Sequence, residues 1–393
     1  MGDSYSSGRF DDYFDLDNAL SPEDLQVRQT IRKFVDTHVR PYAGQWWQEG
    51  KFPQELVVSL GQLGVFGPTL PEEFGGAGLS PIGYGLMMQE LERGDSGLRS
   101  FASVQSGLAM HALYQFGSRE QKQQFLPKMA EGKLIGCFGL TEPDAGSDPG
   151  AMRTVARRHG NHYILTGSKR WITNGSLAQI AIIWAKDDNG VVRGFVVPTE
   201  APGFRAMTIT TKASMKMSVT SDLYFDDVVL PLEARLPLTE GLKSPLHCLT
   251  QARYGIVWGT IGAAMDCLDE AISYTHTRMA FGRTLAKTQL VQERLVYMLS
   301  GLVDMQLRAR QLACLQEQGR LRYPQVSLAK RNNARMALNI ARMGRELLGA
   351  NGISVDYRAI RHMTNLETVD TYEGTFEVQT LVVGRDLTGQ EAF

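Results

Sequence analysis

The chain has 393 residues, of which 43% are hydrophobic and 21% charged. This is the composition of a folded globular protein, and the length exceeds what one compact core usually holds, so we expect two or three domains. The 41 basic and 42 acidic residues leave a net charge of −1, which provides no positive excess for binding nucleic acid or an anionic membrane.

Apolar runs stay far below the ~18 residues of a spanning helix, so we expect no membrane insertion. The polar, acidic start is neither a signal peptide nor an Arg-rich transit peptide. No C-x-x-C pair occurs, which excludes a zinc site or a disulfide framework and fits a reducing compartment. We expect a bacterial cytoplasmic protein or, if this is a mature eukaryotic form, one of the mitochondrial matrix. The four cysteines are Cys137, Cys248, Cys267 and Cys314.

The first third of the chain is predicted to be helical. Ser21 is a suitable N-cap, because Pro22 and two acidic residues follow it, and apolar residues at helical spacing continue to Val39. A loop rich in Gly and Pro covers residues 67–78. We expect an all-helical N-terminal domain over residues 1–133. Further helical patterns cover residues 56–63, 82–93 and 104–116.

The middle of the chain changes to short β-branched and aromatic runs separated by turn signals. We expect a β-barrel or β-sandwich domain over residues 134–242, followed by a helical bundle over residues 243–393. The fold class is therefore α+β and multidomain. The strand patterns cover residues 163–173, 180–185, 193–197 and 223–229. A 4,3-spaced apolar stripe predicts a bundle seam and consists of Val291, Leu295, Met298, Leu302, Met305, Ala309 and Leu312.

The common nucleotide and nucleophile motifs are absent: there is no G-x-G-x-x-G, no Walker A loop and no G-x-S-x-G elbow. Any cofactor must be bound in another way. Four other segments stand out, and each alone is as consistent with a surface turn or a core aromatic as with a site. They are residues 136–148, Trp171-Ile-Thr-Asn174, Arg278-Met-Ala-Phe281 with Gln289, and Thr371-Tyr-Glu-Gly-Thr375.

Together and in this order, the four segments resemble the acyl-CoA dehydrogenase family over residues 20–393. Members are flavoproteins with an N-terminal helical domain, a middle β-domain and a C-terminal four-helix bundle. Within the family, the chain is most similar to the glutaryl-CoA dehydrogenases. That similarity rests on residues 90–100, 103–106, 136–143, 252–259, 330–333, 351–354 and 387–389.

The resemblance implies α,β-dehydrogenation of an acyl-CoA thioester with FAD as cofactor. Glu373 would be the general base, which must be a buried carboxylate with a raised pKa. A variant of the family carries the base at the position of Ala252, which cannot serve here. The family's oxyanion donors are the N–H of the base and a flavin hydroxyl.

The resemblance also implies a flavin site shared between subunits, and hence a homotetramer. Leu140 and Thr141 would lie at the pyrimidine edge and Ser147 at the phosphates, with Trp171 and Thr173 against the ring. The remaining residues would hold the adenylate half across subunits or complete the site, and they are Arg278, Phe281, Gln289, Glu346, Gly349 and Thr375.

Arg99 and Ser100 distinguish the glutaryl-CoA enzymes from general members. A dicarboxylic acyl group brings a carboxylate into an apolar pocket, where a guanidinium can pair with it. Ser100 would add a hydrogen bond, and Glu92, on the same helix face, would position Arg99. An ordinary surface pair is the alternative for Glu92 and Arg99. Arg253 would approach the CoA.

Decarboxylation would follow, because the distal carboxylate of glutaconyl-CoA can leave as CO₂ and crotonyl-CoA results. Members that stop earlier differ at the positions of Glu92 and Tyr372, and both residues are retained here. The chain departs from the usual sequence of the glutaryl-CoA dehydrogenases at two places, Lys216-Met217 and Phe376-Glu377. These differences bring flavin or subunit contacts into question.

Several alternatives stay open. They are a short-chain acyl-CoA dehydrogenase, an oxidase that uses O₂, a glutaryl-CoA enzyme without decarboxylation, and a non-catalytic flavin- or CoA-binding scaffold. For a dehydrogenase, an electron-transfer flavoprotein would be the acceptor.

Overall fold

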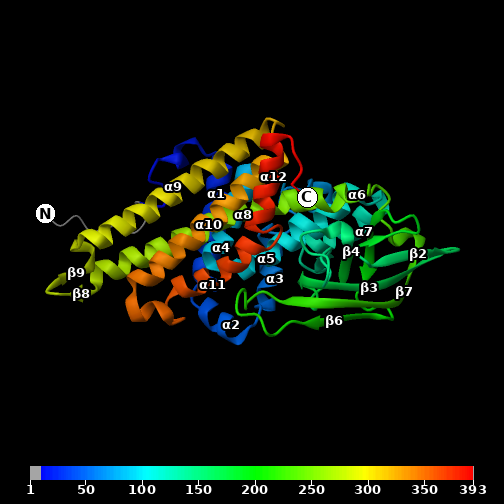
Figure 1. The fold of residues 1–393 in the computed structure, drawn as a ribbon, viewed down its shortest axis with the longest axis horizontal. Coiled ribbons are helices and arrows are strands. Elements are labelled where there is room, and N and C mark those ends of the chain that lie inside the picture. Colours follow the sequence, from blue (N-terminus) through cyan, green and yellow to red (C-terminus); the bar gives the residue numbers. More distant parts are fainter. Residues whose placement is uncertain (1–9, 393) are drawn as a thin grey trace.

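The computed structural model describes residues 10–392, and its three domains follow one another along the chain (Figure 1). Helices form the N-terminal domain, a mixed sheet the middle domain, and long helices the C-terminal domain. The N-terminal elements are α1 (Pro22–His38), α2 (Ala43–Glu49), α3 (Val57–Gln62), α4 (Pro81–Gly94), α5 (Ser96–Ser103), the π-helical η4 (Val104–Met110), α6 (His111–Phe116) and α7 (Arg119–Ala130).

Helix starts in this domain follow their capping residues. The side chain of Ser21 accepts a hydrogen bond from the N–H of Asp24 at 3.1 Å, which confirms the predicted start of α1. The other predicted helices are confirmed as well, but α5 was not foreseen. Asp95 lies in an extended conformation between α4 and α5, and its carboxylate caps the N–H of Gly97. Glu92 and Arg99 therefore lie on two helices rather than on one.

The middle domain is a seven-stranded mixed sheet with the order β1-β4-β2-β3-β7-β6, and β5 pairs with β4. Only the pair Val155–Lys186 links β2 to β4, so the sheet has two halves. Their inner faces share one core, in which the rings of Tyr163 and Phe195 lie 5.2 Å apart. The strands are β1 (Gly136–Gly139), β2 (Val155–His159), β3 (His162–Thr173), β4 (Ile180–Lys186), β5 (Val192–Pro198), β6 (Phe204–Thr208) and β7 (Thr220–Pro231).

The C-terminal domain is built on long helices, which extend away from the sheet in Figure 1. The predicted stripe is confirmed on α9, since it is buried from Met298 to Leu312 and partly buried at Val291 and Leu295. The elements are α8 (Lys243–Thr277), the hairpin β8 (Met279–Ala280) and β9 (Arg283–Thr284), α9 (Gln289–Glu317), α10 (Tyr323–Leu347), η8 (Gly349–Ile353), α11 (Arg358–Thr371) and α12 (Phe376–Thr388).

Helix α8 packs closely on α4 because glycines line its contact face. A Cβ on Gly262 would lie 1.9 Å from the carbonyl oxygen of Gln89, and one on Gly259 would lie 2.1 Å from Oε2 of Glu92. The first approach is to the backbone and leaves no room for a side chain, and the second would displace the carboxylate of Glu92. This contact places the site residues of α4, α5 and α8 side by side. No helix among residues 10–392 is long and apolar enough to cross a membrane.

Candidate active site

Glu373 lies in the turn between α11 and α12, in a conformation that few residues adopt. Its φ is 53° and that of Gly374 is 99°, so two successive residues have positive φ. The carboxylate oxygen Oε2 is buried and has no hydrogen-bond partner within residues 10–392. Burial raises the pKa of Glu373, and the positive charges of Arg99, Arg253 and Lys330 limit this rise. The group is thus poised to take up a proton.

The carbonyl groups of this turn accept hydrogen bonds from buried side chains. Nε of Arg253 donates to the carbonyl of Glu373 at 2.7 Å, and Nζ of Lys330 donates to that of Gly374 at 2.9 Å. Nε2 of Gln379 also reaches the carbonyl of Glu373, at 3.0 Å. The N–H of Glu373 has no acceptor among residues 10–392. Arg253, expected beside the CoA, thus contacts the backbone of Glu373.

Arg99 and Glu92 form a buried ion pair, which excludes the surface pair considered from the sequence. Nε of Arg99 donates to Oε2 of Glu92 at 2.7 Å, and both side chains are fully buried. The hydroxyl of Ser96 donates to the other oxygen of Glu92 at 2.9 Å. Arg99 also donates to the hydroxyl of Tyr372, the neighbour of Glu373. Ser100 is buried in α5 beside Arg99.

Three buried polar atoms around this pair have no partner in the part of the chain that the structure describes: Nη1 of Arg99 and the hydroxyls of Tyr84 and Ser103. A Cβ built on Gly107 would lie 3.6 Å from the hydroxyl of Tyr84 and 3.8 Å from Oγ of Ser103. The two hydroxyls therefore face one point. Because buried polar groups normally have partners, these atoms and Oε2 of Glu373 are available to a polar ligand.

Tyr84 and Ser103 were not foreseen as site residues. A signal was present for each, because Tyr84 lies eight residues before Glu92 on α4 and Ser103 lies four residues after Arg99 on α5. Residues at these spacings share a helix face. Tyr84 is also within electrostatic range of the site. Burial raises the pKa of its phenol, and the charges of Arg99 and Glu373 act on it as well.

A second group of predicted residues meets on the β-domain. The loop after β1 is held against β3, since the N–H of Arg170 donates to the carbonyl of Thr141 at 2.9 Å and Nζ of Lys169 donates to that of Leu140 at 3.0 Å. Lys169 also pairs with Glu142 at 2.8 Å inside the domain. The predicted flavin segments 140–141 and 171–173 therefore lie side by side.

Trp171 projects from a bulge in β3 and leaves its ring free. Its φ is 63°, the pairing with β7 is irregular between Lys169 and Ile172, and the residue is 52% exposed. Ser147 is exposed and Thr173 half-buried. An exposed indole on an unfavourable backbone fits an aromatic ring system that stacks on it. A flavin has this chemistry.

The third group lies at the other end of the long helices. Arg278, Phe281 and Gln289 are exposed around the β8–β9 hairpin, far from the sheet in Figure 1. Glu346 pairs with Arg294 at 3.4 Å, and Gly349 is exposed with a φ of 60°. Within one chain, the residues of this third group therefore lie far from the β-domain that carries Trp171. Thr375 lies apart from this group, because its hydroxyl caps α12 beside the base.

The two departures make contacts within the chain. Nζ of Lys216 donates to the carbonyl of Gln48 at 3.2 Å and lies 4.8 Å from the ring centre of Trp47, and Met217 is buried. The ring of Phe376 packs under two guanidinium groups of α10, those of Arg331 and Arg335.

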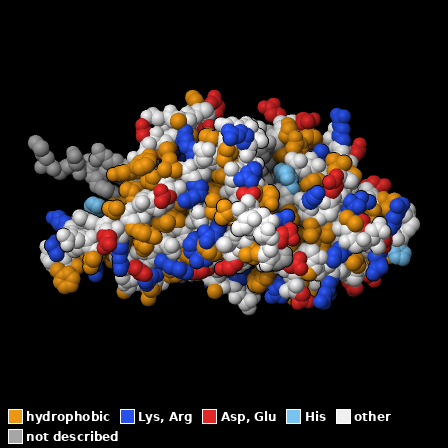
Figure 2. All heavy atoms as spheres, turned by 45° about the horizontal axis from the view of Figure 1, so that its top comes forward, with side chains coloured by type: hydrophobic (Ala, Val, Ile, Leu, Met, Phe, Trp, Pro, Cys, Tyr) orange, Lys and Arg blue, Asp and Glu red, His pale blue; other side chains and the backbone are white. Residues whose placement is uncertain are grey.

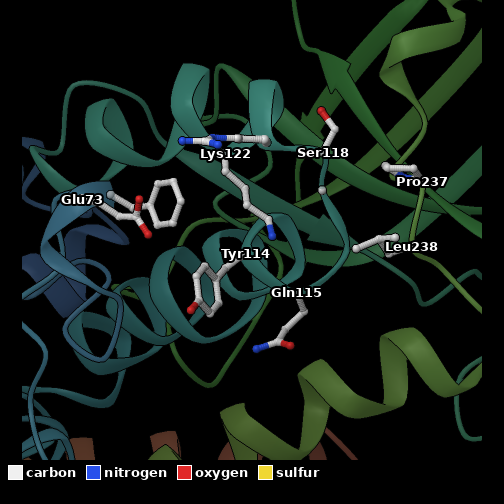
Figure 3. Close-up of a pocket in the computed structure, with 10 residues that line it drawn as sticks. Glu73, Tyr114, Gln115, Ser118, Lys122, Pro237 and Leu238 are labelled. Carbon is white, nitrogen blue, oxygen red and sulfur yellow. The ribbon is translucent and has the colours of Figure 1, made fainter.

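A surface cavity of about 780 Å³ lies away from these groups. It is bounded by α6, α7 and the residues around Pro237, and Figure 3 shows Lys122 reaching toward Tyr114 within it. No predicted site residue lines it. Among the described residues, no cluster of three or more His, Cys, Asp or Glu side chains could hold a metal ion.

Glu373 is a buried carboxylate with a raised pKa beside buried cations, and the exposed ring of Trp171 on the β-domain can stack on an aromatic cofactor. Models of the acyl-CoA dehydrogenase N-terminal, middle and C-terminal domains match residues 21–133, 137–228 and 239–388. The chain therefore belongs to the acyl-CoA dehydrogenase family, as its sequence motifs predicted.

Two solved structures and one characterised relative show which members of the family this chain resembles. The structure of a glutaryl-CoA dehydrogenase from Mycobacterium smegmatis is 50% identical, with a TM-score of 0.96 over 98% of this chain and 99% of that one. A glutaryl-CoA dehydrogenase from the same organism in complex with FADH2 is 48% identical, with a TM-score of 0.96 over 99% and 100%. The human mitochondrial short-chain specific acyl-CoA dehydrogenase is 34% identical, with 93% of this chain and 90% of that protein covered.

Proposed function

We propose that this chain is an FAD-dependent dehydrogenase that oxidises glutaryl-CoA and decarboxylates the product to crotonyl-CoA and CO₂. FAD is the cofactor of the family, and a relative of 48% identity is described in complex with FADH2. Glutaryl-CoA dehydrogenases of 48–50% identity support the substrate. The observation that carries the proposal is the free Nη1 of Arg99.

Arg99 is suited to a second carboxylate, because its guanidinium is only partly used. Nε binds Glu92 and another nitrogen binds Tyr372, whereas Nη1 is fully buried and has no partner among the described residues. A neutral acyl chain would leave this donor unsatisfied, whereas a distal carboxylate would accept from it. The unpartnered hydroxyls of Tyr84 and Ser103 add two further donors in the same region.

Proton transfer falls to Glu373. Its carboxylate takes the α-proton, and the free N–H of the same residue donates to the thioester oxygen as negative charge develops there. FAD, held against Trp171 and Thr173, would supply the hydride acceptor for the β-hydrogen. Arg253 holds the carbonyl of Glu373 and thereby the orientation of the base. The protein excludes water from the reaction, since Oε2 is buried.

Decarboxylation follows from the same arrangement. Loss of CO₂ from glutaconyl-CoA breaks the bond to the γ-carbon and leaves its electron pair in a dienolate of the thioester. Glu373, protonated in the first step, then returns a proton to the γ-carbon. Tyr372 and Glu92 keep Arg99 aligned on the carboxylate until it leaves.

Cofactor binding would join residues of two subunits. Leu140, Thr141, Ser147, Trp171 and Thr173 would hold the flavin half, with Thr375 beside the base. A neighbouring chain would supply the adenylate half from its far end. Those residues are Arg278, Phe281, Gln289, Glu346 and Gly349.

We further propose a homotetramer. Leu290 is 74% exposed at the start of α9, and Phe281 is fully exposed on the hairpin. Figure 2 shows hydrophobic side chains gathered over this end of the molecule. Exposed apolar surface of this kind marks protein interfaces. The acceptor would be an electron-transfer flavoprotein, in the bacterial cytoplasm or the mitochondrial matrix.

Anaerobic titration of the purified protein with glutaryl-CoA, and separately with butyryl-CoA, tests the proposal. Bleaching of the flavin by glutaryl-CoA together with release of CO₂ and crotonyl-CoA is the expected result. Bleaching without CO₂ would indicate the non-decarboxylating reaction. Peroxide formed during turnover in air would indicate an oxidase.

A short-chain acyl-CoA dehydrogenase is the second candidate, favoured by the 34% identity to the human short-chain enzyme. In the same titration it predicts rapid bleaching by butyryl-CoA while glutaryl-CoA stays inert. That result would keep Glu373 as base but remove Arg99 as the carboxylate anchor. A scaffold without catalysis predicts no bleaching by either thioester.

A further inference from the structure

Lys330 on α10 is a buried cation whose hydrogen bonds go to backbone carbonyls. It is fully buried, and its Nζ donates to the carbonyl of Asp370 at 3.0 Å and to that of Gly374 at 2.9 Å. The first carbonyl belongs to the last turn of α11, and the second lies directly after Glu373. One ammonium group therefore ties the end of a helix to the turn that carries the base.

Gln379 on α12 also donates hydrogen bonds to this turn. Its amide nitrogen donates to the carbonyls of Glu373 at 3.0 Å and of Gly374 at 3.3 Å, and the residue is fully buried. A Cβ on Gly374 would lie 2.2 Å from this nitrogen. The turn is thus enclosed by donors from α10 and α12, in addition to Arg253 from α8.

The backbone of the turn needs such support. Glu373 has a φ of 53°, and a non-glycine residue in this region is strained and persists only where its surroundings fix it. Resting on the proposed role of Glu373 as base, we propose that Lys330 and Gln379 are positioning residues that hold the turn 372–375, and that the charge of Lys330 favours the ionised base.

The charges around Glu373 are consistent with the second part of this proposal. Cations reach it from three elements, as Arg99 on α5, Arg253 on α8 and Lys330 on α10. Asp370 on α11 is a nearby anion, and burial lowers the pKa of Lys330 to about 8. Loss of the Lys330 charge removes one of three groups that limit the rise in the pKa of Glu373.

Lys330 and Gln379 together are called the clamp of the turn 372–375. Two measurements on the FAD-loaded protein test its role, with the variants Lys330→Met, Lys330→Arg and Gln379→Leu. The first is hydrogen exchange of peptides spanning residues 371–379, which requires no substrate. The second is the rate of flavin reduction by glutaryl-CoA as a function of pH. Lys212→Met is a matched control, because Nζ of Lys212 also donates to backbone carbonyls, those of Met215 and Ser218, but in the β-domain.

We expect Lys330→Met and Gln379→Leu to exchange faster over residues 371–379 and to reduce the flavin about tenfold to a hundredfold more slowly, as misplaced catalytic groups do. Affinity for the thioester should change little. In Lys330→Met the acid limb of the rate should also move to higher pH, and Lys330→Arg, which keeps the charge, should restore it. Lys212→Met should match the wild type in both measurements.

Unchanged exchange in both clamp variants would overturn the positioning role, whatever the substrate. Faster exchange with an unchanged reduction rate would overturn the catalytic part of the proposal. An acid limb that stays in place in Lys330→Met would refute the role of its charge. If glutaryl-CoA reduces no form of the protein while butyryl-CoA does, the proposed substrate fails, and the same comparison is made with butyryl-CoA.

Discussion

Arg99 and Glu92 meet across the break between α4 and α5, with Nε of Arg99 2.7 Å from Oε2 of Glu92 and both side chains fully buried. The break at Asp95 lets α5 turn Arg99 back toward α4. Glu92 satisfies one side of the guanidinium, and Nη1 on the other side stays unpartnered. Removal of Arg99 alone would leave a buried carboxylate without its cation.

The first prediction concerns this pair. Arg99→Met alone should destabilise the protein by about 3–5 kcal/mol, because a buried charge loses its partner. The double variant Arg99→Met/Glu92→Gln should fold and should raise the KM for glutaryl-CoA about tenfold to a hundredfold, which is the worth of a charged hydrogen bond. Steady-state kinetics with butyryl-CoA serve as the control, and equal losses on both thioesters would refute the carboxylate anchor.

Glu373→Gln should slow flavin reduction by a factor of about 10²–10⁴, the usual contribution of a general base. Stopped-flow absorbance with glutaryl-CoA measures the rate. FAD content and binding of an unreactive thioester should not change. A variant that keeps wild-type reduction would show that another group removes the proton.

The same residue predicts a pH dependence of stability. Burial raises the pKa of Glu373 in the folded state above its value in the unfolded state. The contribution of this group to the free energy of unfolding is therefore fully present below the unfolded-state pKa, and it is lost as the pH rises through the folded-state pKa. Glu373→Gln stays neutral, so its Tm should exceed that of the wild type at pH 8, with the gap closing below pH ~4. Thermal unfolding at both pH values checks this, and a constant gap would contradict it.

Tyr84→Phe isolates one unpartnered hydroxyl. If this hydroxyl binds the acyl carboxylate, the KM for glutaryl-CoA should rise by up to about tenfold and that for butyryl-CoA should not change. The Tm should stay level or increase, because a buried group without a partner is removed. A lower Tm with equal kinetic losses on both thioesters would assign Tyr84 a packing role instead.

Trp171→Ala should weaken FAD retention without destabilising the chain that surrounds it, since the ring is 52% exposed. The absorbance ratio of flavin to protein after dialysis measures retention, and Trp171→Phe, which keeps an aromatic face, should restore most of it. Val229, which is 61% exposed on β7, offers a control in Val229→Ala. Full flavin occupancy in Trp171→Ala would remove this residue from the cofactor site.

Local patterns predicted the elements that have local causes. The cap at Ser21, the apolar stripe of α9 and the β-branched runs of the middle domain each depend on neighbours in sequence, and each is confirmed. The segments around Trp171 and Glu373 identified the family for the same reason. Continuous segments of this kind are legible in one sequence.

Contacts between helices that are distant in the chain could not be predicted from the sequence. Three features depend on how α4, α8, α10 and α11 pack. They are the helix break between Glu92 and Arg99, the unpartnered hydroxyl of Tyr84, and the hydrogen bond from Lys330 to the turn that carries Glu373. A lysine within a helix shows no sign of a buried ammonium group. Only the packed structure shows which side chains converge on Glu373.

Helix α8 has 35 residues and therefore runs for about 52 Å without interruption. It presents Arg253 to the base, Gly259 to the Glu92–Arg99 pair and its C-terminal end to the far hairpin. Each added residue rotates everything beyond it by about 100°. An insertion or deletion in α8 would thus turn the regions beyond it out of line with those before it, so natural length variation should be confined to loops such as that before Gly190.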